Sequence, residues 1–104
     1  MKSTLLTWER GTFLTNNGYL IRLEMKLFQI SKPRVEFPQN YKFQWIVFDE
    51  DNPTKRVLFD NHHGKAPHYH QNGKEKFFEW QDLETTRQMF FQMAYQKFGY
   101  FDYE

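Results

Sequence analysis

The chain has 104 residues, carries a formal net charge of +1, contains no cysteine and is 20% aromatic. This length predicts one domain spanning residues 1–104, and the aromatic content excludes a disordered polypeptide. The absence of cysteine excludes a disulfide framework, and the near-balanced charge means that any nucleic-acid contact must come from a local basic patch.

The first large part of the chain, residues 4–80, is typical of β-structure. Residues 4–14 contain apolar and β-branched positions, and Asn16-Asn17-Gly18 predicts a hairpin turn because Asn and Gly tolerate positive φ. From Ile21 to Leu27 apolar and charged residues alternate, which predicts a strand with one buried and one solvated face. A proline-containing segment at 37–40 then indicates a loop.

Further strands are expected after this loop. In the strand predicted at residues 41–48, both faces carry large apolar side chains, so we expect it to be central and covered on both sides. An acidic turn at 49–53 leads to a strand at 56–59, and residues 77–80 are expected to supply a last strand. Short connections favour antiparallel neighbours, which predicts a meander.

The only predicted helix spans about residues 83–98. Asp82 can cap it, Glu84 suits its first turn, and Gly99 can end it. Its apolar stripe is wider than one sheet contact needs, and Arg87 lies inside that stripe. We therefore predict an α+β fold, a twisted antiparallel β-sheet (meander) with one C-terminal α-helix packed across one face. The aromatic tail at 99–104 is expected to be either a frayed end or a partner-docking segment.

All four histidines fall within the segment 60–70, which concentrates more chemistry than any other part of the sequence. One hypothesis is a metal site. In an extended backbone His68 and His70 point to the same side, and Glu75, His62 or His63 could complete a ligand set with them.

A second hypothesis is proton transfer without a metal or other cofactor. An endoribonuclease of this kind needs a base, an acid and a cation that holds the developing phosphate charge. Histidines can serve as base and acid, Lys65 as the cation, and Gly64 lets the backbone approach an anion. Asp60 can fix the tautomer of a neighbouring histidine.

In a third interpretation the histidine segment is an ordinary loop without a catalytic or metal-binding role. Asp60-Asn61 can form a turn, Gly64 can supply a positive φ, and the histidines can be solvated loop residues. Arg87 can either clamp an anion beside the histidine segment or extend its head to water from the core. An RNA platform is a further alternative, for which the candidate residues are Lys65, Lys74, Lys76, Tyr69 and Phe77.

The run from Val57 to His70 resembles the signature of TumE-type toxins of bacterial toxin–antitoxin systems. In that signature a strand ends in Asp-Asn, Gly-Lys-Gly follows within a few residues, and His-x-His comes next. Ala66 stands where the family has its second Gly of that triplet. The resemblance covers about residues 18–98. The matching positions are Asp60, Asn61, Gly64, Lys65, His68 and His70.

The resemblance implies the toxin of a type II toxin–antitoxin pair, with a helix-turn-helix antitoxin encoded nearby as its partner. RNA is the expected target, which agrees with the proton-transfer hypothesis. His68 and His70 would carry acid–base work, Lys65 would stabilise phosphate charge, and Asp60 would orient a histidine. Asn61 would donate to the substrate or hold the loop, while His62 and His63 fall at variable positions and would at most assist.

Other expectations follow from the whole sequence. We expect a cytoplasmic protein without membrane association, because neither a signal-type apolar run nor a spanning segment is present. A homodimer is compatible with the sequence. The alternative function is a non-catalytic metal-binding or regulatory module that uses the His-x-His pair, with His68, His70 and Glu75 as ligands. The third possible function is that of a protein that only binds a partner, through exposed aromatic side chains.

Overall fold

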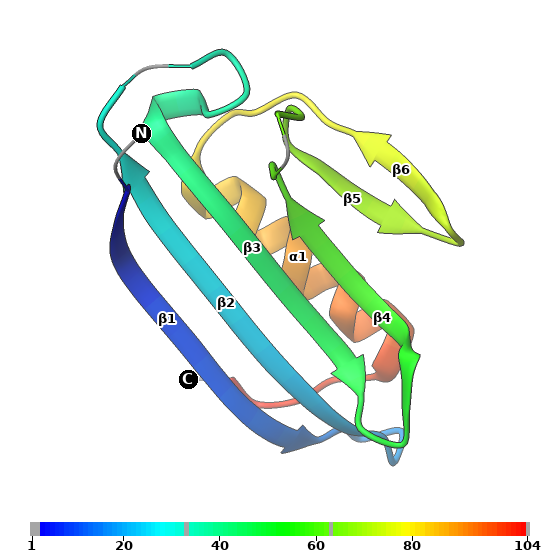
Figure 1. Cartoon of the computed structure of the whole chain (residues 1–104). Helices are drawn as coiled ribbons and strands as arrows, with labels where there is room; N and C mark the ends of the chain where they lie inside the picture. The colour runs from blue at the N-terminus through cyan, green and yellow to red at the C-terminus, as the bar shows by residue number, and fades with distance from the viewer. Residues whose placement is uncertain (1–2, 33, 63, 104) are drawn as a thin grey trace.

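The computed structural model describes residues 3–32, 34–62 and 64–103. Six strands form one sheet, and every neighbouring pair is antiparallel. The strands occur in the sheet in the same order as in the sequence, so the predicted meander is confirmed (Figure 1). They are β1 (Ser3–Leu14), β2 (Leu20–Ile30), β3 (Tyr41–Asp49), β4 (Asn52–Asp60), β5 (His68–Gln71) and β6 (Lys74–Phe77), with a short 3-10 turn, η1, at Pro38–Asn40 before β3.

The turns follow the local chemistry of the sequence. In the β1–β2 hairpin the backbone N–H of Thr15 donates to the carbonyl of Tyr19 (2.8 Å), and Gly18 adopts a φ of 88°. The β5–β6 hairpin turns through Asn72 and Gly73, both at positive φ, in a two-residue loop typical of Asn-Gly. The last strand spans Lys74–Phe77, so the strand predicted at 77–80 is wrong except for Phe77, because Phe78 and Trp80 leave the sheet and pack against the core.

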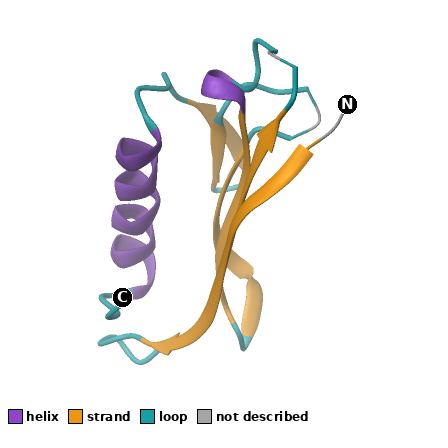
Figure 2. Ribbon diagram, turned by 90° about the vertical axis from the view of Figure 1, so that its left-hand side faces the viewer, coloured by secondary structure: helices purple, strands orange, loops and turns teal. Residues whose placement is uncertain are grey.

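One helix, α1 (Leu83–Phe98), covers one face of the sheet (Figure 2). Its bounds are those predicted: the Asp82 carboxylate accepts a hydrogen bond from the Thr85 N–H (2.6 Å), and Gly99 ends the helix with its N–H on the Tyr95 carbonyl (2.8 Å). The N–H of Thr85 lowers the pKa of Asp82. The α+β prediction is therefore confirmed.

The core lies between α1 and the sheet face that the helix covers. Alternate residues of β2, β3 and β4 point into it, as the period of two requires. Rings cross from sheet to helix, for example Trp45 and Phe59 onto Phe90, with centroids 5.8 and 5.5 Å apart. The main buried apolar side chains are Ile21, Leu23, Met25, Leu27, Phe43, Trp45, Val47, Val57, Phe59, Phe90, Ala94, Phe98 and Phe101.

The opposite face of the sheet carries no second layer in the described parts of the chain. The expectation that β3 is covered on both sides is therefore wrong. Ile46 and Phe48 on its outer face remain only half-buried, sheltered by neighbouring side chains of the same face. We call this surface, on the side of the sheet away from α1, the open face.

Residues 99–103 of the aromatic tail are not frayed, because the tail packs on the rest of the chain. Phe101 is 2% exposed and packs on Phe13 and Tyr95 (centroids 5.4 and 5.1 Å), while Tyr103 stacks on Phe91 at 5.2 Å. This contact explains the width of the apolar stripe on α1, because part of the stripe faces the sheet and part faces the tail. In the described residues, no helix is both long enough and apolar enough to cross a membrane.

Candidate functional site

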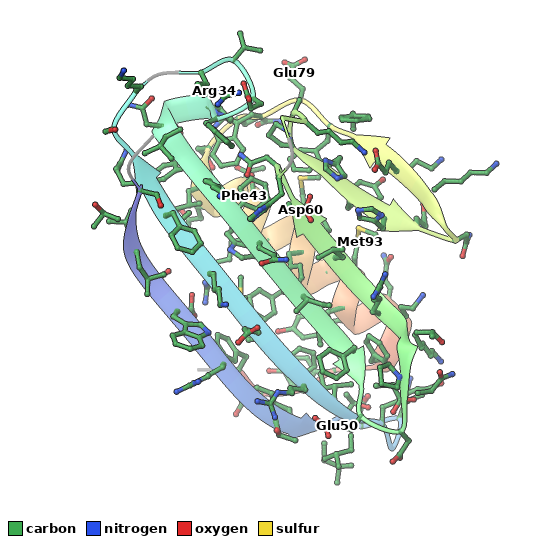
Figure 3. The ribbon with its side chains drawn as sticks, viewed as in Figure 1. Arg34, Phe43, Glu50, Asp60, Glu79 and Met93 are labelled. Atoms are coloured by element: carbon green, nitrogen blue, oxygen red, sulfur yellow. The ribbon has the colours of Figure 1, made fainter. Side chains whose placement is uncertain are left out.

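Asp60 and His68 face each other on neighbouring strands. Asp60 is the last residue of β4 and His68 the first residue of β5, and the two are directly paired across the ladder. Residues paired in this way point to the same face of a sheet. Phe59 and Tyr69, the adjacent pair, point into the core, so Asp60, His68 and His70 all lie on the open face. Figure 3 labels Asp60 on β4, beside the β5–β6 hairpin.

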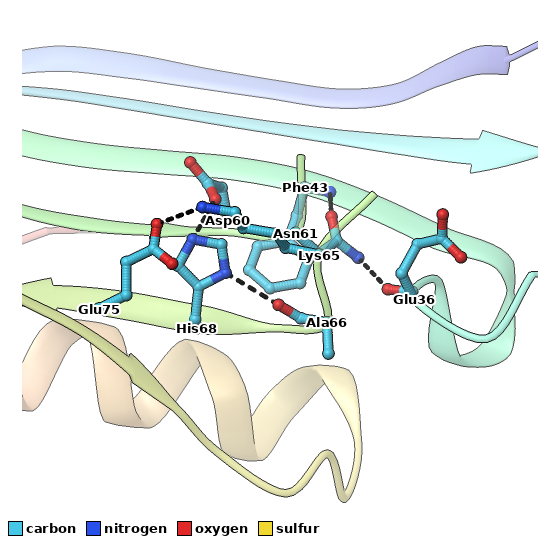
Figure 4. Close-up of polar contacts among 8 residues, drawn as sticks. All are labelled: Glu36, Phe43, Asp60, Asn61, Lys65, Ala66, His68 and Glu75. Atoms are coloured by element: carbon cyan, nitrogen blue, oxygen red, sulfur yellow. Dashed lines mark hydrogen bonds and ion pairs between the residues drawn. The ribbon is translucent and has the colours of Figure 1, made fainter. Parts of the chain in front are cut away.

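His68 is held at both ring nitrogens. Its Nε2 lies 3.0 Å from Oδ1 of Asp60, and its Nδ1 lies 2.8 Å from the carbonyl oxygen of Ala66 (Figure 4). A carbonyl oxygen can only accept, so Nδ1 carries a proton. The other ring nitrogen, Nε2, faces the Asp60 carboxylate, and a proton on that nitrogen would lie between the two groups. Asp60 therefore contacts a histidine, as its predicted orienting role requires, and the role itself stays a prediction.

The imidazole of His70 lies beside that of His68, with ring centroids 5.1 Å apart. His68 is buried, with 2% of its surface exposed, whereas His70 is only half-buried. The two histidines therefore differ in access: His70 can meet a ligand directly, whereas His68 is shielded from solvent and contacts Asp60. One ligand atom each from Asp60, His68 and His70 lies within 4.8 Å of the others, which is a grouping able to hold a metal ion.

Lys65 reaches the same site from the loop between β4 and β5. Its Nζ lies 2.6 Å from Oε2 of Glu75 on β6, and Glu75 is the direct ladder partner of His70 (Figure 4). The hydrogen bond from Lys65 lowers the pKa of Glu75, and the nearby charges of Lys65, His68 and His70 lower it further. Lys65 and Glu75 thus form a partly exposed ion pair next to the histidines. The grouping of ligand atoms contains Asp60 as its third member, whereas Glu75, the predicted third ligand, is paired with Lys65.

Asn61 has a structural role. Its side chain is fully buried, and its amide joins three backbone groups of the preceding loop and strand. The Phe43 N–H donates to Oδ1 (3.0 Å), and Nδ2 donates to the carbonyls of Tyr41 (2.9 Å) and Glu36 (3.1 Å). Of the two expected roles, holding the loop is the one that these contacts support.

The remaining residues of the histidine segment surround the site. Gly64 is exposed and adopts a φ of 73°, and a Cβ there would lie 4.0 Å from a Glu36 oxygen, so its conformation rather than space favours glycine. His62 is half-buried next to Asn61. His63 lies outside the described residues.

Arg87 does not reach the histidines. Its two terminal nitrogens bind the Glu9 carboxylate at 2.6 and 2.8 Å, and Glu9 also accepts a hydrogen bond from the Tyr103 hydroxyl. The predicted clamp is wrong because Glu9 holds the guanidinium of Arg87 at β1, an edge strand of the sheet, whereas His68 and His70 lie on β5 near the other edge. The ion pair lowers the pKa of Glu9 and raises that of Arg87. Burial, together with Glu9, raises the pKa of Tyr103 to about 12.

The residues of the expected RNA platform also lie on two different faces of the sheet. Lys76 is paired with Tyr69 on the side of the core, whereas Phe77 is paired with His68 on the open face. The residues that do share a surface with the histidines come from strands distant in sequence. One row of paired residues crosses all six strands on the open face: Trp8, Lys26, Gln44, Asp60, His68 and Phe77.

Sequence reasoning missed Trp8 and Lys26 as neighbours of the site in this row. The hairpin turn fixes the register of β1 against β2, so the alternation in both strands could have placed Trp8 beside Lys26. Their alignment with Asp60 depends on the longer loop between β2 and β3. The sequence of this loop gives no comparable signal for its path.

Comparison of the chain with protein-family models, with curated proteins and with solved structures finds no match. The likeness to TumE-type toxins therefore rests on the motif residues themselves.

Proposed function

We propose that this protein is the toxin of a type II toxin–antitoxin pair and that it cleaves RNA by metal-independent acid–base chemistry. The observation that carries this proposal is the convergence of Asp60, His68, His70 and Lys65 at one point of the open face. Three of these residues are brought together by the β4–β5–β6 ladder and the fourth by the loop above it. They are also the chemically active residues of the TumE-like motif.

The open face suits single-stranded RNA as a ligand. Trp8 is 45% exposed and Phe77 is 58% exposed, at opposite ends of the row that contains Asp60 and His68. Exposed rings can stack on bases, and basic side chains between them can follow the backbone phosphates. Lys26 and Arg10 both lie over the Trp8 ring, 5.0 and 4.2 Å from its centroid. The basic side chains that the register places on this face are Arg10, Arg22, Lys26, Lys42 and Arg56.

The roles follow from access and protonation. His70, the more exposed imidazole, takes the proton of a ribose 2′-hydroxyl, whose oxygen forms a bond to the adjacent phosphorus. The bond from phosphorus to the 5′-oxygen breaks, and the leaving oxygen receives the proton shared by His68 and Asp60. The pair delivers it at Asp60, whose side chain is 12% exposed against 2% for His68. Lys65 balances the added charge on the phosphate oxygens. His68 is then a positioning residue.

Growth after expression without the antitoxin is the first test. We expect the parent to arrest growth and His70→Ala and Lys65→Ala to relieve the arrest, while Lys74→Ala on the same hairpin, outside the cluster, arrests like the parent. Purified parent is expected to cleave single-stranded RNA in the presence of a chelator and to leave cyclic phosphate ends. Absence of arrest by the parent, or cleavage that His70→Ala leaves unchanged, would contradict the proposal.

The proximity of ligand atoms from Asp60, His68 and His70 favours a second candidate function, a non-catalytic metal-binding module. Imidazole nitrogens with one carboxylate suit zinc and similar ions. Zinc titration of untagged protein distinguishes the two candidates. Stoichiometric binding that Asp60→Asn abolishes, without RNA cleavage, favours the metal module, whereas cleavage in chelator favours the toxin.

The toxin proposal includes a partner and a location. The partner is a helix-turn-helix antitoxin encoded beside this chain, and the location is the cytoplasm, where both the RNA and the antitoxin occur. Co-purification of the two gene products after joint expression tests the partner. Recovery of the toxin alone, together with growth arrest that the neighbouring gene does not relieve, would exclude it.

A further inference from the structure

A polar notch lies where the β5–β6 hairpin diverges from β4. The strand β4 spans nine residues, yet β5 pairs only with Leu58, Phe59 and Asp60. Below these pairs the two elements separate toward the tip of the hairpin (Figure 1), and α1 contributes Lys97 to the cavity at this place. The resulting cavity is about 400 Å³, and it is lined by Thr54, Arg56, His70, Asn72, Gly73 and Lys97.

The charge in this notch is entirely basic. Its lining contains two permanent cations, Arg56 and Lys97, together with His70, and no carboxylate. Within the described parts of the chain neither Arg56 nor Lys97 forms an ion pair, whereas Arg22, Arg34, Lys65 and Arg87 each bind a carboxylate. Two neighbouring cations without a counter-charge repel each other and attract an anion. The guanidinium fork of Arg56 suits the paired oxygens of a phosphate in particular.

The rim of the notch is preorganised. Asn72 and Gly73 form the hairpin turn with φ values of 53° and 77°, and both residues line the cavity. No heavy atom lies within 4 Å of a Cβ built on Gly73, so the turn is open to a ligand.

His70 connects the notch with the candidate site. It lines the cavity and also belongs to the group of ligand atoms with Asp60 and His68. A strand of RNA with one phosphate in the notch therefore passes the imidazole of His70 before it reaches Lys65 and Asp60.

We propose that this notch is a phosphate subsite, in which Arg56, Lys97 and His70 hold a non-scissile phosphate of single-stranded RNA next to the reacting one. The inference rests on the proposed function for the identity of the strand, while the affinity for phosphate rests on the notch alone. In this proposal Arg56 and Lys97 take over the phosphate recognition that the sequence predicts for Arg87. They do so in a cavity that His70 also lines.

Equilibrium binding of a labelled, non-cleavable single-stranded oligonucleotide with 2′-O-methyl sugars tests the proposal. Arg56→Gln with Lys97→Gln is expected to weaken binding by about tenfold, the loss expected from charge-assisted contacts. The slope of log affinity against log salt should become shallower by about 0.7 for each phosphate that the protein no longer neutralises. The matched control is Lys74→Gln with Lys76→Gln, which removes the same charge from the same hairpin region outside the notch and should change affinity less than the notch pair.

Three outcomes would overturn the subsite. The first is equal weakening by the notch pair and the control pair, which would show only a general charge effect. The second is an acidic peptide that competes as well as the oligonucleotide, which would assign the notch to a protein partner. The third is the absence of chemical-shift changes at Arg56, His70 and Gly73 when inorganic phosphate is titrated into the parent.

The phosphate titration also separates this proposal from the one on which it rests. Shifts at the notch without any RNA cleavage would support the subsite and contradict the ribonuclease. Cleavage that the Arg56→Gln, Lys97→Gln protein performs with unchanged KM would support the ribonuclease and overturn the subsite.

Discussion

Two polar clusters occupy opposite faces of the same sheet. In the first, which we call the tail corner, Glu9 of β1 binds Arg87 of α1 and Tyr103 of the tail. In the second, the histidine cluster, Asp60, His68, His70 and Lys65 meet on the open face with Glu75. Both contain an ion pair with a 2.6 Å contact, so geometry alone does not separate a structural cluster from a functional one.

The two clusters differ in which of their polar groups remain available to a ligand. The tail corner joins three distant segments of the chain, and its carboxylate already has two partners. The histidine cluster joins neighbouring strands that the ladder would hold in any case, and it keeps a half-buried imidazole beside two cations of the notch that have no carboxylate partner in the described chain. The comparison indicates that the first cluster serves stability, and it supports the binding or catalytic role that we propose for the second.

The largest expected effect is a loss of stability when the packing beside the tail corner is disrupted. Phe101→Ala should lower the free energy of unfolding by about 3–5 kcal/mol, because a buried ring is replaced by a cavity. Tyr100→Ala is the matched control, since Tyr100 is 54% exposed and its loss should cost far less. Urea denaturation measures both. Equal stability of the two variants would show that the tail does not hold the fold.

His68→Ala tests whether the histidine cluster also contributes to the stability of the fold. We expect a loss of about 3 kcal/mol in the free energy of unfolding, because the Asp60 carboxylate remains without its buried partner. His70→Ala should cost much less, yet both variants should lose RNA cleavage. If His70→Ala were the more destabilising, the division into a positioning residue and an exposed base would be reversed.

The Glu9–Arg87 pair should contribute less, about 0.5–1 kcal/mol, because both side chains are about one-third exposed and solvent screens them. A double-mutant cycle with Glu9→Gln and Arg87→Gln measures this coupling. The pKa of Glu9 is lowered in the folded protein, so the contribution is present above its ordinary value of 4.5 and is lost as pH falls through the lowered value. A coupling energy that stays constant through this acid range would contradict the ion pair.

The smallest effect concerns Tyr103 at alkaline pH. Its pKa is raised to about 12 from 10.0, so its contribution to stability is complete below pH 10.0 and is lost as the pH approaches 12. Phenolate absorbance should show one tyrosine titrating late in the parent and none titrating late in Tyr103→Phe. RNA cleavage at neutral pH should be the same in both proteins.

Features determined by neighbouring residues could be predicted from the sequence. The bounds of α1 follow from Asp82 and Gly99, and the first hairpin follows from its Asn-Asn-Gly turn, because caps and turns are local interactions. The sharing of one face by His68 and His70 follows from the period of a strand. In contrast, the contact of His68 with Asp60 depends on how the loop at 61–67 returns to the sheet, and spacing alone does not determine that path.

The partner of Arg87 could not be predicted, because Glu9 lies 78 residues away and is joined to it only by the final packing of the helix. The width of the apolar stripe on α1 did carry a signal, since it exceeded what the sheet required. That excess could have indicated that the tail returns to the helix. The notch is equally non-local, because it exists only where two strands stop pairing.

The docking of the tail has a consequence for the order of folding. Each strand pairs with its neighbour in sequence, so the sheet can grow hairpin by hairpin with small loops to close. The hydrogen bonds between Asn16 and Tyr100 instead span 84 residues, a closure that costs about 4 kcal/mol of chain entropy. We therefore expect this contact to form after the main folding barrier, so that weakening it speeds unfolding and leaves the folding rate almost unchanged.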